Sequence, residues 1–317
     1  MLNSYVIIVG GGPGGSACAR RLKQANIACL VLDQQVFPRF KPCAGWITPG
    51  GLRELALDPA EYPHSFTTFN SFYISLRGFK FRLPAHQNAI RRYEFDDWLL
   101  RRSGAPVLQH TVKEITKTGD GYEIDGEFSA KFLVGDGGTH CPVYRSLFQA
   151  HSPRPKAALI AAMEEEFPYT YNDPHCRLWF LEDGLPGYSW YVPKANGYVN
   201  VGVGGQAEVL KAHGDTLKNH WNKLVEKLER MGLVRGHSYK PSGHSYYLRQ
   251  RQSELRRGNA FLVGDAAGLA TMDMGECICP AIHSGRLAAE SILTGGIYSV
   301  DAIPRYSLNS LLRLGWA

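Results

Sequence analysis

A glycine-rich turn close to the N-terminus constrains the fold of this chain more than any other feature. The sequence Gly10-Gly11-Gly12-Pro13-Gly14-Gly15 fits the pattern G-x-G-x-x-G and directly follows the short apolar run 5–9. A segment with helical spacing, 13–24, comes next, and a second apolar run, 27–32, ends in Asp33. This order of strand, glycine turn, helix, strand and acid predicts a Rossmann-like unit that binds a dinucleotide.

Each part of this turn has a physical reason. Gly10 permits the tight turn, Gly12 lets the backbone approach a pyrophosphate, and Gly15 lets the helix lie close to the strand. The helix that opens at Pro13 directs N–H groups and a positive dipole end at the phosphates. Asp33 is expected to accept hydrogen bonds from the adenosine ribose. The motif alone does not decide between FAD and NAD.

The composition excludes several classes of protein. Of the 317 residues, 44% are hydrophobic and 20% are charged, which is enough apolar material for roughly two domains. No apolar run approaches the roughly 18 to 20 residues of a membrane-spanning helix, and the N-terminus does not resemble a secretory signal, so we expect a cytoplasmic protein. The cysteines and histidines show no disulfide framework and no metal-ligand spacing, so we assign no metal.

The net charge of +6 bears on the choice of partner. The arginines are dispersed along the chain and form no stripe, so nucleic acid is not expected to bind. An anionic cofactor, an acidic substrate or the anionic surface of a membrane would be attracted.

Alternating apolar residues predict antiparallel strands after the dinucleotide-binding unit. Segment 66–83 alternates about Arg77-Gly78 and predicts a hairpin, and segment 94–102 is expected to be helical. The turn Asp125-Gly126 indicates a meander. Its three strands are expected at 107–115, 121–124 and 127–134.

The second half of the chain predicts a further sheet and its covering helix. Its strands are expected at 157–167, 177–181, 188–192 and 197–203. One amphipathic helix is predicted over 206–231. A buried strand at 260–263 then leads through a glycine-rich turn to a helix at about 281–293. No linker appears, so the two domains are expected to be interleaved.

The C-terminal turn resembles a known cofactor signature. Residues 259–268 read Asn-Ala-Phe-Leu-Val-Gly-Asp-Ala-Ala-Gly, which is similar to the second FAD motif of para-hydroxybenzoate hydroxylase-type flavoproteins. The resemblance implies that Asp265 bonds the ribityl chain and that the next helix directs its positive end at the flavin. The cofactor-binding positions that it implies here are Gly264, Asp265, Gly268, Gly275, Glu276, Cys277 and Ile278.

Three further segments are similar to the geranylgeranyl reductase-like branch of these flavoproteins, and the resemblance covers nearly all of the chain. Lys41-Pro42-Cys43-Ala44-Gly45 resembles its K-x-C-x-G segment, and residues 92–96 match its R-x-x-F-D motif. Residues 186–193 are similar to its P-x-x-Y-x-W-x-F-P motif, although the spacing after Pro186 is one residue shorter and valine replaces phenylalanine. The resemblance places Lys41, Cys43, Ala44 and Arg92 at the cofactor. It places Tyr188, Trp190, Tyr191 and Pro193 in the substrate pocket. From the residues alone, these aromatic side chains could equally be core, and Cys43 could be an inert thiol.

The chain departs from the family pattern at several positions. The family's G-A-D-G motif appears as Gly135-Asp136-Gly137-Gly138, with the acid displaced by one position. Met272 stands near the place of an expected proline, and Cys277 replaces an expected glycine. The chain ends before the C-terminal helical part expected from the family, so we expect part of the substrate pocket to be missing or supplied by a partner.

The fold expected from these patterns is α/β. A Rossmann-like FAD-binding domain of the three-layer ββα type is interleaved with a mostly antiparallel β-sheet substrate domain. The FAD-binding domain is expected at 1–62, 87–153 and 249–317. The substrate domain is expected at 63–86 and 154–248.

The family resemblance implies an FAD-dependent reductase. FAD would pass hydride to a carbon–carbon double bond of an apolar, prenyl-type substrate, with a proton from Cys43 or water. No second dinucleotide motif is present, so either transient NAD(P)H or an electron-donor protein would supply electrons. A flavin monooxygenase of the aromatic hydroxylase type and a non-catalytic FAD electron-relay protein are the alternatives. A halogenase is disfavoured because the W-x-W-x-I-P stretch is incomplete at 188–193.

Overall fold

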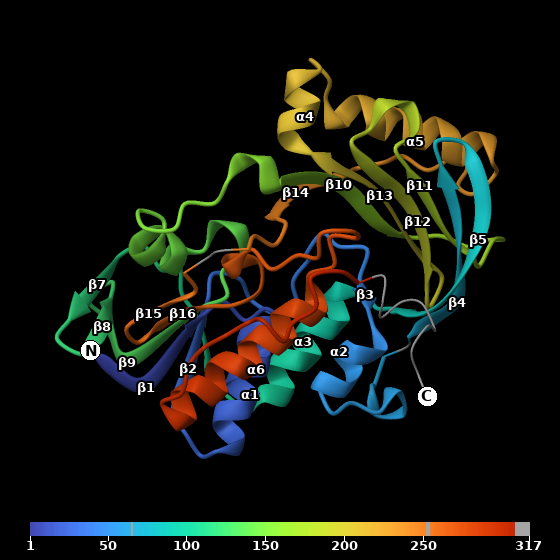
Figure 1. Cartoon of the computed structure of the whole chain (residues 1–317). Helices are drawn as coiled ribbons and strands as arrows, with labels where there is room; N and C mark the ends of the chain where they lie inside the picture. Colours follow the sequence, from blue (N-terminus) through green and yellow to red (C-terminus); the bar gives the residue numbers. More distant parts are fainter. Residues whose placement is uncertain (65, 252–253, 308–317) are drawn as a thin grey trace.

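One sheet, sheet A, carries the N-terminal strand at its centre. The structure is a computed structural model that describes residues 1–64, 66–251 and 254–307 (Figure 1). The strand order is β15-β16-β9-β1-β2-β6, β8 also pairs with β9, and β7 pairs with β8. Sheet A consists of β1 (Leu2–Val9), β2 (Cys29–Asp33), β6 (Val107–Gln109), β7 (Ile115–Thr118), β8 (Gly121–Ile124), β9 (Phe128–Gly135), β15 (Arg256–Arg257) and β16 (Ala260–Leu262). β1 runs parallel to both β2 and β9, and its residues 6–8 are fully buried, as is usual in the centre of a parallel sheet.

Three helices cover one face of sheet A. They are α1 (Pro13–Gln24), α3 (Arg92–Ser103) and α6 (Ile278–Thr294) (Figure 1). Val6 and Ile8 of β1 pack with Leu22 of α1 and Ile292 of α6 on this side. On the other side, Ile7 packs with residues of the β7–β8 ribbon. Helices, sheet and ribbon form three layers, which confirms the predicted Rossmann-like ββα architecture.

The other sheet, sheet B, is mostly antiparallel, as expected. Its order is β14-β10-β13-β12-β11-β4-β5-β3, and only β11 and β4 pair in parallel. The strands are β3 (Trp46–Ile47), β4 (Thr67–Leu76), β5 (Phe79–Ala89), β10 (Leu159–Pro168), β11 (Cys176–Phe180), β12 (Gly187–Lys194), β13 (Tyr198–Gln206) and β14 (Ser242–Tyr247). Two helices, α4 (Ala207–Ala212) and α5 (Leu217–Arg230), cover its outer face (Figure 1). A short helix, α2 (Pro49–Glu54), follows β3.

Two predicted elements are wrong. The segment 107–115 is not one strand of a meander, because β6 leaves α3 and pairs in parallel with β2, whereas β7 begins separately at Ile115. A strand that returns after a helix crossover joins the sheet in parallel, and local alternation does not show this. The helix predicted over 206–231 is two helices, because Gly214 adopts φ +62° and Thr216 caps α5 by accepting a hydrogen bond from Asn219 N.

Three strands were not predicted from the sequence: β3, β14 and β15, the last of which has only two residues. β3 has two residues, and β14 is rich in polar and aromatic residues without clear alternation. β14 lies at the edge of sheet B and pairs with β10 over Leu159–Glu164. Within the residues that the structure describes, no helix is long and apolar enough to cross a bilayer.

The packing of α1 against α6 generates a stability prediction. A Cβ on Gly285 of α6 would collide with the carbonyl oxygen of Gly14, so only glycine lets these helices meet here. Gly285→Val is expected to lower the free energy of unfolding by about 1 to 3 kcal/mol through overpacking. Denaturant titration measures this change. Gly50→Ala in α2 is the control because its Cβ meets ordinary contacts, and a shift of equal size in both variants would contradict the packing account.

Candidate functional site

A cavity of about 590 Å³ lies at the carboxyl ends of the central strands of sheet A. A crevice at this edge is where open α/β sheets bind their ligands, and its volume is typical of cofactor pockets. Its wall combines the glycine turn, the acid that ends β2, the segment after β9 and residues of β14. The wall includes Gly12, Pro13, Asp33, Arg39, Lys41, Arg92, Asp136, His244, Asp265, Cys277 and Ile278.

The glycine turn leaves no room for side chains. Gly10 has φ +110°, and a Cβ there would collide with the carbonyl oxygen of Asp136. A Cβ on Gly12 would lie 2.8 Å from Asp136 Oδ2, and one on Gly14 would lie 2.6 Å from Asp136 Oδ1. A Cβ on Gly15 would strike the carbonyl oxygen of Gly10. The turn therefore forms a cradle of bare backbone at the start of α1, as a bound diphosphate requires.

Asp33 is the last residue of β2 and lines the cavity with only 8% of its surface exposed. Its Oδ2 accepts a hydrogen bond from Gly11 N at 2.7 Å, and its Oδ1 accepts one from Gln35 N at 2.8 Å. Each carboxylate oxygen keeps a further lone pair. The side chain is therefore fixed in place and can still accept a hydroxyl group, as a ribose-binding role requires.

Asp136 is a functional candidate that the sequence marks only as an acid displaced from the family motif. Gly15 N donates to its Oδ2 at 2.7 Å, so the carboxyl group caps the first turn of α1. Burial raises the pKa of Asp136 well above its usual range, and nearby Asp265 raises it further, while Gly15 and Arg39 oppose the rise. A carboxyl group shifted toward its neutral form lies beside an anionic ligand with little repulsion.

The opposite wall of the cavity carries cations and a histidine. Lys41 Nζ lies 2.7 Å from His244 Nε2, which in turn lies 3.9 Å from Asp265 Oδ2. Burial lowers the pKa of Lys41, and burial together with the charge of Lys41 lowers the pKa of His244 to about 4. His244 is therefore neutral at pH 7, and this wall presents a polar donor and acceptor set to a ligand.

Arg92 connects the cavity with the next pocket. It makes a bidentate ion pair with Asp96, with both N–O distances at 2.7 Å, and Asp96 also lies 3.4 Å from Arg39 Nη1. Burial opposes the charge of Arg92, yet Asp96 and the side chain of Cys43 hold its pKa above the usual arginine value. The guanidinium is thus a fixed cation beside the sulfur of Cys43.

A narrow pocket of about 70 Å³ adjoins the cavity and shares Lys41, Pro42 and Arg92 with it. Its wall is mainly apolar and aromatic. It includes Cys43, Ala44, Trp46, Ala162, Glu164, Tyr188, Trp190, Tyr246 and Met274. The two sheets and the 41–46 segment thus bring the predicted cysteine and two of the predicted aromatic residues together.

Tyr191 and Pro193 do not line this pocket. Successive side chains of a strand point to opposite faces, so Tyr188 and Trp190 face the pocket while Tyr191 faces α5. Tyr191 is fully buried among the residues under α5, and its hydroxyl donates to the carbonyl oxygen of Asp173 at 3.0 Å. The alternation within 188–193 was a signal that could have excluded both residues.

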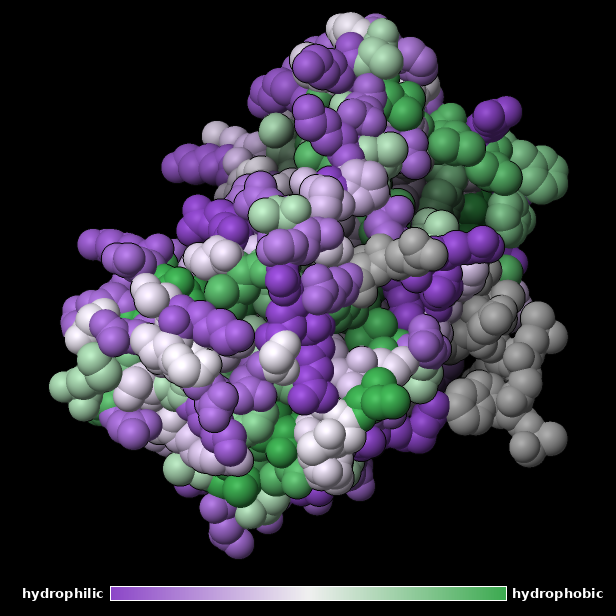
Figure 2. All heavy atoms as spheres, turned by 60° about the vertical axis from the view of Figure 1, so that its left-hand side comes forward, coloured by the Kyte–Doolittle hydropathy of each residue, from purple (hydrophilic) through white to green (hydrophobic). Residues whose placement is uncertain are grey.

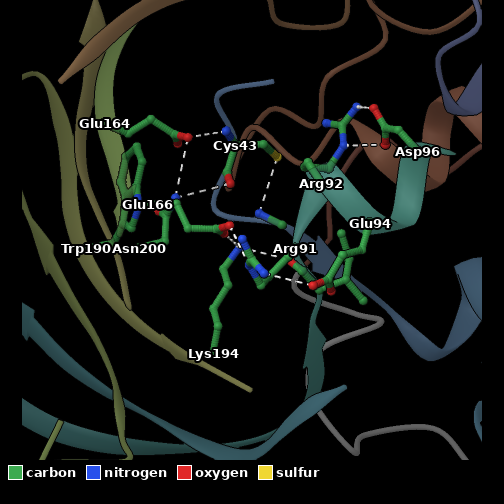
Figure 3. A network of polar contacts seen from close by, with 12 residues as sticks. Cys43, Arg91, Arg92, Glu94, Asp96, Glu164, Glu166, Trp190, Lys194 and Asn200 are labelled. Carbon is green, nitrogen blue, oxygen red and sulfur yellow. Dashed lines mark hydrogen bonds and ion pairs between the residues drawn. The ribbon is translucent and has the colours of Figure 1, made fainter. Parts of the chain in front are cut away.

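Side chains of sheet B hold the backbone of Cys43 from two sides (Figure 3). Cys43 N donates to Glu164 Oε1, and Asn200 Nδ2 donates both to the carbonyl oxygen of Cys43 and to Glu164 Oε1, each at 3.4 Å. Trp190 Nε1 fixes Asn200 by donating to its Oδ1 at 2.7 Å. Gly202 gives Trp190 room, because a Cβ there would collide with the indole ring. We call Glu164, Asn200 and Trp190 the Cys43 clamp.

One carboxyl group of the clamp, that of Glu164, has a raised pKa. Glu164 is 3% exposed, and burial raises its pKa to about 7 against the opposing charge of Lys194 and the hydrogen bond from Cys43 N. Glu166, two residues along β10, raises the pKa further. Glu164 therefore titrates near neutral pH. No motif marks this residue, because strand pairing alone brings it to Cys43.

A second group of charges secures the neighbouring start of α3. Lys194 Nζ lies 3.0 Å from Glu166 Oε2 and donates to the carbonyl oxygen of Ile90 at 2.7 Å. Arg91 Nε donates to Glu166 Oε1 at 2.9 Å and its Nη1 donates to Glu94 Oε1 at 2.7 Å (Figure 3). Sheet B therefore orients both Cys43 and the segment that carries Arg92.

The residues of the C-terminal signature have two places in the structure. Some line the two pockets, and others shape the turn. Asp265 lines both pockets, as do Cys277 and Ile278, whereas Gly275 and Glu276 line only the narrow one. Burial raises the pKa of Glu276 to about 7, and its Oε1 accepts a hydrogen bond from Cys279 N at the start of α6.

The two remaining glycines of the signature shape the turn. Gly264 and Gly268 adopt φ +56° and +65°. A Cβ on Gly264 would lie 3.0 Å from Asp136 Oδ1, so this glycine is also needed for close packing. Gly268 lines neither pocket and instead faces Tyr247.

The comparisons with known proteins agree with this geometry. Residues 8–39, which contain the glycine turn and Asp33, match the family model described as an NAD(P)-binding Rossmann-like domain. An uncharacterized protein of Methanosarcina barkeri is 32% identical over 97% of this chain and 80% of its own length. The menaquinone reductase of Mycolicibacterium smegmatis is 27% identical over 92% of this chain and 77% of its own length.

A solved structure shares the fold over most of its length. A geranylgeranyl bacteriochlorophyll reductase-like protein of Thermoplasma acidophilum superposes with a TM-score of 0.80 at 23% identity, over 93% of this chain and 80% of that protein. At this identity the likeness shows that the two proteins share a fold. The chain belongs to the geranylgeranyl reductase-like branch of the para-hydroxybenzoate hydroxylase-type FAD-dependent oxidoreductases.

Proposed function

We propose that this protein reduces a carbon–carbon double bond of an apolar, prenyl-type substrate with hydride from FAD. The observation that carries the proposal is the narrow apolar pocket that opens from the cofactor cavity beside Cys43. The names of similar proteins support the choice, since one is a menaquinone reductase and another is geranylgeranyl bacteriochlorophyll reductase-like. The apolar wall favours a hydrocarbon over a polar substrate.

The residues of the cavity fit FAD. The bare backbone at Gly12 and the start of α1 would hold the diphosphate, and Asp33 would bind the adenosine ribose. Asp265 and the start of α6 at Cys277 and Ile278 would face the ribityl chain and the flavin. When bound, FAD supplies two-electron chemistry, accepting electrons from a donor and delivering hydride. Transient NAD(P)H or an electron-donor protein is the proposed source of electrons.

Cys43 is the proposed proton donor. Its Sγ accepts a hydrogen bond from Gly45 N at 3.3 Å and lies beside the Arg92 guanidinium. Both groups hold the sulfur in place at the wall of the narrow pocket. Reduction of an alkene needs a proton as well as hydride, and Cys43 lines the pocket where the alkene would lie.

The Cys43 clamp is proposed to position this thiol. Both backbone polar groups of Cys43 are bonded by buried side chains of sheet B, while its sulfur faces Arg92. Rotation of the residue is thereby restricted. Because a misplacement of about 1 Å costs on the order of 100-fold in rate, such restriction is a direct contribution to proton transfer.

The cofactor assignment yields a prediction for the glycine turn. Gly12→Val should give colourless protein, because the side chain would occupy the space of the diphosphate and press on Asp136. The absorbance of bound FAD and its stoichiometry after desalting measure the effect. Gly50→Ala serves as the control and should keep FAD. Stoichiometric FAD in folded Gly12→Val would show that the turn is not the cofactor site.

The proton-donor role yields a prediction for Cys43. Cys43→Ser should bind FAD and accept electrons, yet transfer hydride to an alkene at least about 100-fold more slowly. Single-turnover oxidation of the prereduced variant by an alkene without oxygen measures this rate. Cys176→Ala is the matched control, because Cys176 is a buried thiol outside the pocket wall. An unchanged rate in Cys43→Ser would remove the residue from proton transfer.

The clamp yields a prediction with a pH dependence. Burial raises the pKa of Glu164 from its usual 4.5 to about 7 in the folded protein, so an opening that exposes Glu164 to water becomes easier as pH rises from about 4.5 to 7, and protection of the Cys43 amide should fall over this range. Hydrogen exchange, corrected for the intrinsic rate at each pH, measures this protection. Glu164→Gln should abolish the pH dependence, and Glu164→Ala should lower protection about 10-fold, the scale of one lost hydrogen bond.

Glu165 offers a matched control on the same strand. Its side chain points to the other face of sheet B and contacts His237 Nε2 at 3.0 Å rather than Cys43. Glu165→Ala should leave Cys43 protection and its pH dependence unchanged. An equal loss of protection in Glu164→Ala and Glu165→Ala would show general destabilisation and contradict the clamp.

A further inference from the structure

Large apolar side chains are exposed together at the free end of sheet B. Phe79 is 72% exposed, Leu76 43%, Leu181 41% and Phe81 38%. Leu76 pairs with Phe79 across the β4–β5 hairpin and with Phe180 of β11, the residue before Leu181, so these side chains are neighbours. Figure 2 shows hydrophobic side chains gathered at the upper right edge of the molecule, at the height of this hairpin in Figure 1.

Basic residues without acidic partners lie at the same end of sheet B, and those on β5 point to the opposite face of the sheet from Phe79 and Phe81. Arg77 forms the hairpin turn, Lys80 and Arg82 alternate with the two phenylalanines on β5, and Arg230 ends α5. Among the residues that the structure describes, none of these four cations lies within 4.0 Å of a carboxylate oxygen. The two nearby acids, Glu182 and Asp183, both lie within 4.0 Å of Lys227. This end of the molecule therefore combines apolar surface with an excess of positive charge.

The apolar surface continues inward to the narrow pocket. Strand alternation places Leu76, Phe180 and Tyr188 on the same face of sheet B. The rings of Phe180 and Tyr188 lie 5.0 Å apart, and the rings of Tyr188 and Trp46 lie 6.5 Å apart. Tyr188 and Trp46 both line the pocket. A row of aromatic side chains on one face of the sheet therefore joins the hairpin to the wall of the narrow pocket.

We propose that the free end of sheet B, formed by Leu76, Phe79, Phe81 and Leu181 with Arg77, Lys80, Arg82 and Arg230, docks on an anionic lipid surface. The apolar side chains enter the interface, and the cations bind lipid phosphates. The docked end then receives an apolar substrate from the bilayer and passes it along the sheet to the pocket. This second step rests on the proposed function, whereas docking does not.

The usual explanation for charges on an edge strand accounts for only part of this surface. Lys80, Arg82 and Pro84 on β5 would prevent another chain from adding to the sheet. Such protection does not require exposed aromatic residues, which increase the risk of association. Phe79 and Phe81 therefore need an apolar partner, and the cations at the same end of the sheet favour one that is negatively charged. Arg82 also donates to Ser71 Oγ at 2.8 Å.

Vesicle co-sedimentation of the full FAD-loaded chain tests the proposal. The protein should bind vesicles of equal parts phosphatidylglycerol and phosphatidylcholine and should bind pure phosphatidylcholine vesicles far less. Lys80→Ala with Arg82→Ala should weaken binding about 25-fold, at the scale of a basic residue near an anionic surface. Phe79→Ser with Phe81→Ser should weaken it at least about 10-fold. Ile297→Ser is the control, because Ile297 is 93% exposed after α6, away from this end.

Several results would overturn docking. Docking would be wrong if the protein did not bind the anionic vesicles, if it bound both vesicle types equally, or if the phenylalanine variant bound as well as the wild type. Self-association that the phenylalanine variant abolishes, without vesicle binding, would assign the surface to a second copy instead. Vesicle sedimentation does not depend on catalytic turnover, so its result tests docking even if the proposed reductase function is wrong. For substrate entry, the phenylalanine variant should slow reduction of a vesicle-borne alkene but not of a short soluble one, and equal rates on both would overturn entry.

Discussion

The close approach of the glycine turn to the end of β9 is the constraint on which the rest of the site depends. Backbone meets backbone at Gly10 and Asp136, and no side chain fits between them. This contact fixes where α1 begins and therefore where its N–H groups point. It also places the carboxyl group of Asp136 against Gly12, Gly14 and Gly15, with a pKa that burial raises well above its usual range. A protein that must hold a diphosphate benefits from such an acid only while the acid stays largely neutral.

Sheet B completes the site by holding the segment that carries Cys43 and the start of α3. The segment that carries Cys43 leaves the dinucleotide-binding unit, and Glu164 and Asn200 of sheet B capture its backbone. Lys194 and Glu166 hold the start of α3 in the same way, so that Arg92 faces the sulfur of Cys43. The reacting groups are thus set by contacts between two interleaved sheets. On one face of sheet B, aromatic side chains continue from the pocket wall toward the exposed hairpin of β4 and β5.

Sequence patterns predicted the parts of this structure that local chemistry determines. Helix α1 spans 13–24 as expected, because glycine and proline mark its start, and the hairpin turns at Arg77-Gly78 as expected. The error at 107–115 has a different origin, since the parallel pairing of β6 with β2 joins residues about 75 positions apart. Glu164 and His244 were missed for the same reason. They carry no motif and reach the site only through the pairing of β10 with β13 and β14. The misplacement of Tyr191 was avoidable, because strand alternation alone puts it on the far face.

The measurement that tests the proposed reductase most directly is the reoxidation of the wild-type protein by a prenyl alkene in the absence of oxygen. Photoreduced, FAD-loaded protein should be reoxidised in a single turnover, and one saturated bond should form for each FAD. Admission of oxygen in place of the alkene should give only slow reoxidation. Reoxidation that needs both oxygen and substrate, with a hydroxylated product and no saturation, would contradict the reductase and assign the protein to the monooxygenases.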